Sequence, residues 1–260
     1  MATARNERSR GSGVRGRPRN GRIEREYAKY LRQLATHVGG IVGRYEQGLE
    51  SLPKLQRLLH AYAEDLVPWA KRVSLKMIKE VDDRERSSWA ALGSAISTQL
   101  HRELRTAPMQ EAFRKLQELQ VDLITSIPSK AAQRVAELTV KGLTSGVRAK
   151  EVAAAIAETT QITKERATLI ARTETSRAAS TLLHVRCDSV GATHYVWRTS
   201  EDSDVRPGHK AMNGKVCEWA NPPAVNEGGR IMRHHPGEIW NCRCYAEPII
   251  PDPYKPDRRR

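Results

Sequence analysis

The sequence predicts a mainly α protein, with an elongated N-terminal helical bundle followed by a small α+β C-terminal module that has a short antiparallel sheet and long irregular loops. Up to about residue 190, apolar residues recur at alternating steps of three and four, which is typical of amphipathic helices. From residue 193 the period changes to two, and residues 199–245 then show neither period but are rich in Gly, Pro, Asn and Asp. Only 39% of the residues are hydrophobic, which is lean for one large core.

The charge balance points to partners rather than to the fold. The chain has 44 basic and 30 acidic residues and a net charge of +14, which suits nucleic acid, an anionic membrane surface or an acidic protein. No run approaches the roughly 18 apolar residues of a membrane span, and the first residues carry arginine where an export signal has its apolar core. We therefore expect no membrane span and no secretion, and four cysteines in such a chain favour thiols or a metal over disulfides.

Residues 1–22 are predicted to form a disordered arginine-rich arm, because they hold seven arginines against one acid and almost nothing apolar. Such an arm can bind the phosphates of DNA or RNA, and it can equally be a solvated tail or contact an acidic protein. It lacks the aromatic residues that stack on bases, so base-specific recognition is not expected. The arginines are Arg5, Arg8, Arg10, Arg15, Arg17, Arg19 and Arg22.

Residues 23–127 form the predicted long-helix region. Each predicted helix carries one narrow apolar stripe, so the helices either pack on each other as an elongated bundle or dock on the helices of another protein. Gly39-Gly40 is a candidate kink, and Pro68 predicts a kink or a break. The expected helices are 23–47, 53–81, 84–105 and one that begins near Pro108 and includes Leu123.

Pro128 marks the predicted start of a C-terminal domain, residues 128–250, which precedes a basic tail, residues 251–260. We expect helices over 129–144, 148–158 and 163–190, the last with Thr163 as its N-cap and Gly191 as its stop. Residues 193–199 alternate as a strand with Tyr195 and Trp197 on one face, and residues 242–250 are its expected partner.

The stretch 199–245 concentrates possible metal ligands, with three of the four cysteines and three of the eight histidines. Cys242 and Cys244 leave the same face of an extended segment, so both sulfurs can meet one zinc ion. His209 and His235 can complete the site, with Cys217 as a further ligand. A disulfide, or buried thiols that act as small hydrophobic groups, are the alternatives. Cys187 lies in a helical stretch and is expected to pack.

A set of short motifs resembles the C-terminal domain of the phage Mu protein F-like family, the minor head (head morphogenesis) proteins of tailed bacteriophages. The motifs are Ala171-Arg-Thr-Glu-Thr175, Trp197-Arg-Thr-Ser, Asp202, Arg206-x-x-His209, Asn213-Gly214, His235-Pro-Gly237 and Asn241-Cys-Arg-Cys244. The resemblance covers about residues 165 to 250. It implies a few copies per virion, contact with portal and with major head or scaffolding proteins, and a role in DNA packaging or ejection. It also implies a place in the virion, at the head interior or portal vertex, after assembly in the host cytoplasm.

The resemblance also marks residues for structural roles. Some relatives carry Cys-x-x-Cys where this chain has Arg206 and His209, and Arg206 cannot bind a metal, so His235 or Cys217 would have to supply the fourth ligand. Arg172 and Glu174 are expected to brace the loop beyond, unless they are ordinary exposed charges. Asp202 and Arg206 are expected to form an internal ion pair. Gly214 and Asn241 complete this structural set.

An enzyme is the alternative function. Asp202, Asp204, His209, His234 and His235 are residue types that a zinc-dependent nuclease or another hydrolase uses. However, the chain has no His-Glu-x-x-His, no phosphate-binding Gly-rich loop and no nucleophile elbow. His234-His235 also lies in a Pro/Gly loop rather than at the start of a ββα unit. We therefore expect no catalytic residues. A third alternative, nucleic-acid binding without a role in the virion, rests on the arm alone.

Overall fold

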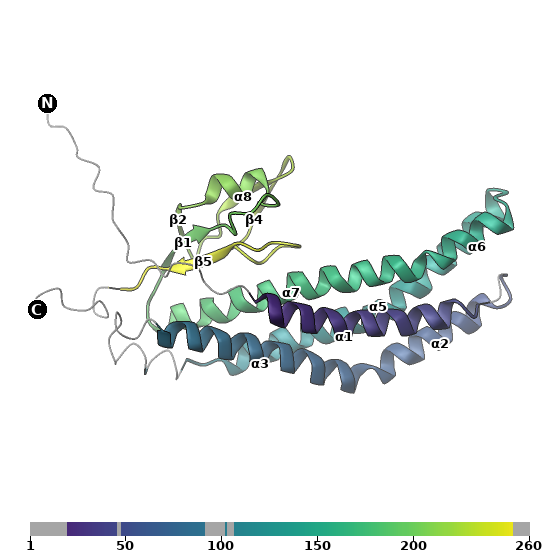
Figure 1. The fold of residues 1–260 in the computed structure, drawn as a ribbon, viewed down its shortest axis with the longest axis horizontal. Helices are drawn as coiled ribbons and strands as arrows, with labels where there is room; N and C mark the ends of the chain where they lie inside the picture. Colours follow the sequence, from purple (N-terminus) through teal and green to yellow (C-terminus); the bar gives the residue numbers. More distant parts are fainter. Residues whose placement is uncertain (1–19, 46–47, 92–101, 103–106, 252–260) are drawn as a thin grey trace, which may run out of the picture.

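The computed structural model describes residues 20–45, 48–91, 102 and 107–251. An elongated bundle of long helices carries a small, mostly non-helical module beside one of its ends (Figure 1). The predicted fold class is therefore confirmed. The basic tail beyond Pro251, most of the predicted helix 84–105 and the arm up to Arg19 lie outside the described residues, whereas Arg22 belongs to the first helix. Among the described residues, no helix combines the length and the apolarity needed to cross a bilayer.

The bundle is built from helices α1 (Gly21–Val42), α2 (Leu52–Asp65), α3 (Val67–Ala91), α5 (Gln110–Thr144) and α7 (Thr159–Ser189), with the short α6 (Ala149–Ala157) at its far end (Figure 1). The predicted apolar stripes face inward, and side chains such as Leu31, Leu59 and Ile124 are fully buried. α1 lies along α7, where a Cβ on Gly39 would overlap the side chain of Thr160. Gly39 therefore permits close helix packing, and α1 runs past Gly39-Gly40 to Val42.

The break predicted at Pro68 is confirmed. α2 ends at Asp65 and α3 begins at Val67, so Pro68 is the second residue of α3, where its missing N–H has no helical partner to lose. A new helix near residue 84 was the wrong prediction, because α3 continues to Ala91. Asp82 explains the continuity, since it is buried and pairs with Arg186 of α7, which anchors this part of α3 to the bundle.

The helix boundary predicted at Pro128 is wrong, because α5 passes through this proline. The buried stripe continues on both sides of it, with Ile124 and Ile127 before and Ala131 and Val135 after. Packing on both sides therefore outweighs the lost backbone hydrogen bond and the clash of the proline ring, which together cost about 3 kcal/mol in a helix interior. The start of the C-terminal domain at residue 128 stays a prediction.

The end of α7 was predicted better than its start. Thr163 is not the N-cap, because the helix begins at Thr159 and the Thr163 hydroxyl donates back to the Thr159 carbonyl at 2.6 Å. At the other end, Gly191 has a φ of +66° and follows the C-cap Val190, as predicted. The N–H groups of Gly191 and Ala192 donate to the carbonyls of Asp188 and Cys187, which is the Schellman arrangement.

The C-terminal module contains two small antiparallel sheets. β1 (His194–Arg198) lies between β2 (Val216–Glu218) and β5 (Tyr245–Pro248), and the predicted pairing of β1 with the last strand is confirmed. Tyr195 and Trp197 share the buried face of β1, as predicted. β3 (Ala224–Glu227) and β4 (Arg230–Arg233) form a separate hairpin, and α8 (Pro207–Met212) packs against β3.

Among the described residues, α7 contributes to two buried apolar clusters. Its first part, up to Leu182, packs with the bundle, whereas Leu183 and Cys187 pack with Tyr195 and Trp197 of the module. The expectation that Cys187 serves packing is confirmed by its full burial in this second cluster. α7 thus fixes the module on the bundle.

Candidate metal centre

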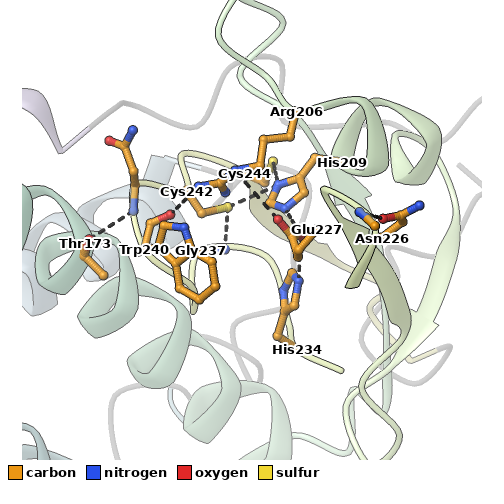
Figure 2. Close-up of polar contacts among 12 residues, drawn as sticks. Thr173, Arg206, His209, Asn226, Glu227, His234, Gly237, Trp240, Cys242 and Cys244 are labelled. Atoms are coloured by element: carbon orange, nitrogen blue, oxygen red, sulfur yellow. Dashed lines mark hydrogen bonds and ion pairs between the residues drawn. The ribbon is translucent and has the colours of Figure 1, made fainter. Parts of the chain in front are cut away.

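Four segments of the module meet at His209. His209 lies on α8, Glu227 ends β3, His234 follows β4, and Cys242 and Cys244 lie in the loop before β5 (Figure 2). The close approach of α8 to β3 depends on Gly208, where a Cβ would overlap the carbonyl oxygen of Asn226. The next residue, His209, therefore reaches the end of β3.

The β3–β4 hairpin places Glu227 at this junction. Its two-residue turn is Gly228-Gly229, with φ values of +69° and +99°, the left-handed backbone that a type I′ turn requires. The Asn226 side chain accepts a hydrogen bond from the Gly229 N–H at 2.7 Å. Glu227 thus leaves the strand at its last residue and points at His209, with its side chain only 3% exposed.

One side of the His209 ring faces two sulfur atoms. His209 Nδ1 lies 3.3 Å from Cys244 Sγ and 3.5 Å from Cys242 Sγ, and all three ligand atoms lie within 4.8 Å of one another. The three residues are buried, with exposed fractions of 2% to 6%. Two sulfurs and one imidazole nitrogen at this spacing are three-quarters of a tetrahedral zinc site.

The other side of the ring faces a carboxylate. His209 Nε2 donates to Glu227 Oε1 at 2.6 Å, and His234 Nε2 lies 3.1 Å from the same oxygen. A proton on Nε2 leaves the lone pair of a neutral imidazole on Nδ1, which is the atom that faces the sulfurs. His209, Glu227 and His234 are also close enough to form a second possible ligand group.

The surroundings of the two sulfurs favour the charged thiolate at Cys242 and oppose it at Cys244. The hydrogen bond from Cys244 lowers the pKa of Cys242, burial opposes this effect, and His209 and the Gly237 N–H, 3.4 Å from the sulfur, lower the pKa further. The same pairing, together with burial, raises the pKa of Cys244. Burial acts to lower the pKa of His209, but Cys242 and Glu227 outweigh it and raise this pKa. Cys242 is therefore the first sulfur to become a thiolate.

The residues fit a soft divalent ion. The two cysteines are free thiols rather than a disulfide. The lone pair on Nδ1 and two sulfurs converge on one point, and a backbone N–H already faces the sulfur of Cys242, as suits a thiolate acceptor. Within the described part of the chain, no fourth His, Cys, Asp or Glu belongs to the same group. His209, Cys242 and Cys244 would hold the ion, which would cross-link α8 to the segment before β5.

The structure does not bring the other two predicted ligands to this group. His235 contacts a different set of residues: its Nδ1 lies 2.9 Å from the Tyr195 hydroxyl, and its ring lies beside those of Trp219 and His184. Cys217 is on β2 opposite Tyr195, and burial raises its pKa. The neighbouring His234, rather than His235, turns toward His209.

The residues of the Arg-Thr-Glu motif hold the cysteine loop against α7. Arg172 donates to the Asn241 side chain at 2.8 Å and also pairs with Glu24 of α1, and the Asn241 N–H donates to the Thr173 hydroxyl at 3.0 Å. These contacts fix Asn241 in the left-handed region, with a φ of +57°, immediately before Cys242. Arg172 and Thr173 of the motif therefore both contact Asn241 of the cysteine loop.

Glu174 braces the loop through a second residue. Its carboxylate accepts from Gln120 at 2.8 Å and from Arg177 at 2.6 Å, and Arg177 donates to the Glu238 carbonyl at 2.9 Å. Tyr27 donates to the other end of the Gln120 amide at 2.8 Å. Burial raises the pKa of Glu174, although Arg177 and Gln120 oppose this effect. A buried polar chain thus runs from α1 to the loop.

The remaining motif residues shape the rim of the module. Asp202 accepts from Arg243 at 3.0 Å, whereas Arg206 donates to the Trp240 carbonyl at 2.9 Å and lies 3.7 Å from Glu227 Oε2. The expected ion pair between Asp202 and Arg206 is thus replaced by two others: Asp202 pairs with Arg243, and Arg206 faces Glu227. Gly214 has a φ of +82° in the turn between α8 and β2, and its N–H donates to the Trp197 carbonyl.

Glu227 was not among the residues predicted for the site. One signal was available, because Asn226-Glu-Gly-Gly229 between two short alternating runs is typical of a tight hairpin. Such a turn fixes which side chains of the strand face inward, but the sequence does not say what they face. Pairing Glu227 with His209 required knowledge that α8 packs on β3.

The fold and the site together define a class of protein: a long-helix body with a small module closed by a Cys/His/Glu cluster. Residues 133–247 match the family described as Phage Mu protein F like protein, so the resemblance predicted from the motifs is confirmed for this segment. The family connects this segment with phage head morphogenesis.

A relative and the solved structures complete the comparison. An uncharacterized protein of Haemophilus influenzae is 33% identical over 148 residues, which are 56% of this chain and 32% of that protein. The match therefore spans about a third of the length of that relative. No solved structure matches this chain.

Proposed function

We propose that this chain is a minor capsid, or head morphogenesis, protein of a tailed phage or prophage, and that zinc on His209, Cys242 and Cys244 holds its C-terminal module. The single observation that carries the proposal is the meeting of these three ligand atoms inside the segment that matches the phage Mu F-like family. In this proposal the helical body docks on other head proteins, and the module is a rigid domain held beside it.

Docking on portal and on major head or scaffolding proteins is the proposed task of the bundle. The apolar stripes that face inward pack in the core of the bundle, so docking would use side chains on its outer surface. Val140 and Leu143 near the end of α5 offer such a surface, since they are 47% and 60% exposed. The arginine-rich arm would bind DNA during packaging or ejection. The protein would reside in the virion, at the head interior or portal vertex, after assembly in the host cytoplasm.

The burial of the two cysteine ligands supports a structural rather than a catalytic role for the ion. A catalytic zinc keeps an open position that substrate reaches, whereas Cys242 and Cys244 are only 2% and 6% exposed. The Glu227 carboxylate lies on the far side of the His209 ring from the sulfurs, so it is not placed as a general base beside the ion. We therefore propose no enzyme activity.

Elemental analysis of the purified full chain tests the metal. The expected result is about one zinc per chain, lost in His209→Ala, Cys242→Ser and Cys244→Ser and kept in the controls His194→Ala and Cys217→Ser. His194 is an exposed histidine of the same module, and Cys217 is a cysteine outside the ligand group. Zinc lost in the Cys217 variant would place that residue among the ligands, and absence of metal from the unaltered chain would contradict the proposal.

Two assays separate the proposed role from its alternatives. Co-expression with portal and head proteins should give particles that contain the chain, and these particles should lose it when the outward residues Val140 and Leu143 become charged. A plasmid-cleavage assay with a range of divalent ions should show no turnover. Cleavage that disappears in His209→Ala would instead support the zinc-dependent nuclease.

A further inference from the structure

The carboxylate of Glu227 is buried without an obvious structural reason. It ends a four-residue hairpin strand, yet its side chain is only 3% exposed, and removing a carboxylate from water costs several kcal/mol unless it is paired. Its Oε1 accepts a hydrogen bond from His209 Nε2, and His234 Nε2 lies 3.1 Å from the same oxygen. The other oxygen, Oε2, has no hydrogen-bond partner within the described residues and lies 3.7 Å from Arg206.

The contact with His209 selects one ring tautomer. An ionised carboxylate only accepts hydrogen bonds, so the proton of a neutral His209 stays on Nε2, 2.6 Å from Glu227 Oε1. The lone pair is then on Nδ1, the nitrogen that faces both sulfurs (Figure 2). A metal-binding histidine commonly donates its other N–H to a carboxylate in this way, which orients the ring and makes the ligand nitrogen more basic.

Arg206 completes the charge balance of this arrangement. A divalent ion with two thiolates is neutral, which leaves the Glu227 charge to be compensated. Arg206 Nε faces Glu227 Oε2, while its other end donates to the Trp240 carbonyl at 2.9 Å. Arg206 cannot be a metal ligand. As the N-cap residue of α8, which also carries His209, it lies close enough to Glu227 to be the counter-ion of its carboxylate.

We infer that Glu227 is the positioning residue of the metal centre, holding His209 with Nδ1 toward the ion, and that Arg206 neutralises Glu227. This inference rests on the proposed metal centre. It adds two residues that do not touch the ion, and it assigns the ligand atom of His209. The second group, His209, Glu227 and His234, is then the outer layer of the same centre rather than a separate site.

Zinc affinity, measured by competition with a chromophoric chelator, tests the inference on the full chain. Glu227→Gln is expected to weaken binding by roughly tenfold to a hundredfold, the usual effect of losing such a partner. Glu227→Asp should be intermediate. Glu218→Gln removes the same charge from exposed strand β2 and should leave the affinity unchanged. Equal affinity of the Glu227→Gln variant and the unaltered chain would overturn the inference while leaving the metal centre intact.

A measurement without substitution covers the case in which the Glu227 variants do not fold. Long-range ¹⁵N–¹H correlation spectra of the zinc-loaded chain should show His209 protonated at Nε2 and metal-bound at Nδ1. A proton on Nδ1 with metal at Nε2 would overturn the inference and place the ion among His209, Glu227 and His234. If the unaltered chain binds no zinc in either experiment, the proposed centre itself fails, which is a distinguishable result.

Discussion

The bundle and the C-terminal module are stabilised in different ways. The bundle buries continuous apolar stripes over helices of up to 35 residues, so its core is spread along its whole length. The module has strands of three to five residues, and its apolar cluster is joined by polar and sulfur contacts around His209. We therefore expect the bundle to tolerate the loss of a single contact better than the module tolerates loss of the contacts around His209.

The largest difference between the two regions should follow removal of the sulfur ligands. In the double variant Cys242→Ser, Cys244→Ser, we expect the module to lose its order, because structural zinc contributes on the order of 10 kcal/mol in small metal-dependent folds. Hydrogen exchange should accelerate over residues 194–248 and stay slow over α5. Protection of the module equal to that of the unaltered chain would show that the two regions do not differ in this respect.

Truncation of a core residue of the bundle should lower stability and leave the metal centre unchanged. Leu31→Ala, at a fully buried position, is expected to lower the free energy of unfolding by about 2–5 kcal/mol without changing the zinc content. Leu58→Ala is the matched control, because this leucine is 53% exposed and should change stability by less than about 1 kcal/mol. Thermal unfolding followed by circular dichroism, with metal analysis of the same samples, checks both values.

Gly208→Ala tests the junction that brings α8 to β3. The added methyl group would overlap the Asn226 carbonyl, so α8 must shift and take His209 away from Glu227. We expect a loss of about 1–3 kcal/mol in module stability and weaker zinc binding. Lys210→Ala on the exposed side of the same helix is the control. A fully stable Gly208→Ala protein with unchanged affinity would show that this close approach is not required.

Arg172 tests the connection between the two regions. Because its hydrogen bond to Asn241 is exposed to solvent, Arg172→Ala should cost only about 1 kcal/mol. Asn241→Gly keeps a residue that tolerates the left-handed backbone and removes the same contact, so the double variant should be no worse than the poorer single variant. Chemical denaturation of the four proteins gives the coupling energy, and strict additivity would contradict a direct interaction.

The smallest expected effect concerns Glu174, whose pKa is raised by burial above its usual 4.5. Above that usual value the folded chain binds more protons than the unfolded chain, so this residue makes stability fall as the pH rises through the raised pKa. Glu174→Gln keeps an amide oxygen for Gln120 and should flatten this dependence. Denaturation curves between pH 4 and pH 7 measure it, and an unchanged slope would remove Glu174 as the cause.

Sequence patterns predicted the bundle well because helix packing repeats. Stripes at steps of three and four predicted α1 and the buried faces, and Pro68 predicted the break between α2 and α3. At Pro128 a local signal for a helix end lost to buried apolar packing that continued past it. At Thr163 the hydroxyl donates back to the Thr159 carbonyl inside the helix instead of capping its start. The stop at Gly191 was predictable because a left-handed residue after the last turn is a purely local requirement.

The site was only partly predictable because its contacts are long-range. His209, Cys242 and Cys244 could be chosen by residue type and spacing, and they do meet. The choice between His234 and His235 depends on which face of the turn after β4 each occupies, and the sequence does not fix that face. Glu227 and the partners of Arg206 and Asp202 depend on how α8, the hairpin and the cysteine loop pack together.

X-ray absorption at the zinc edge of the purified full chain tests the central claim most directly. We predict two sulfur neighbours at about 2.3 Å and at least one nitrogen neighbour at about 2.0 Å, the distances of thiolate and imidazole ligands. A zinc ion surrounded only by nitrogen and oxygen, or a chain that holds no metal when its cysteines are reduced, would contradict the account.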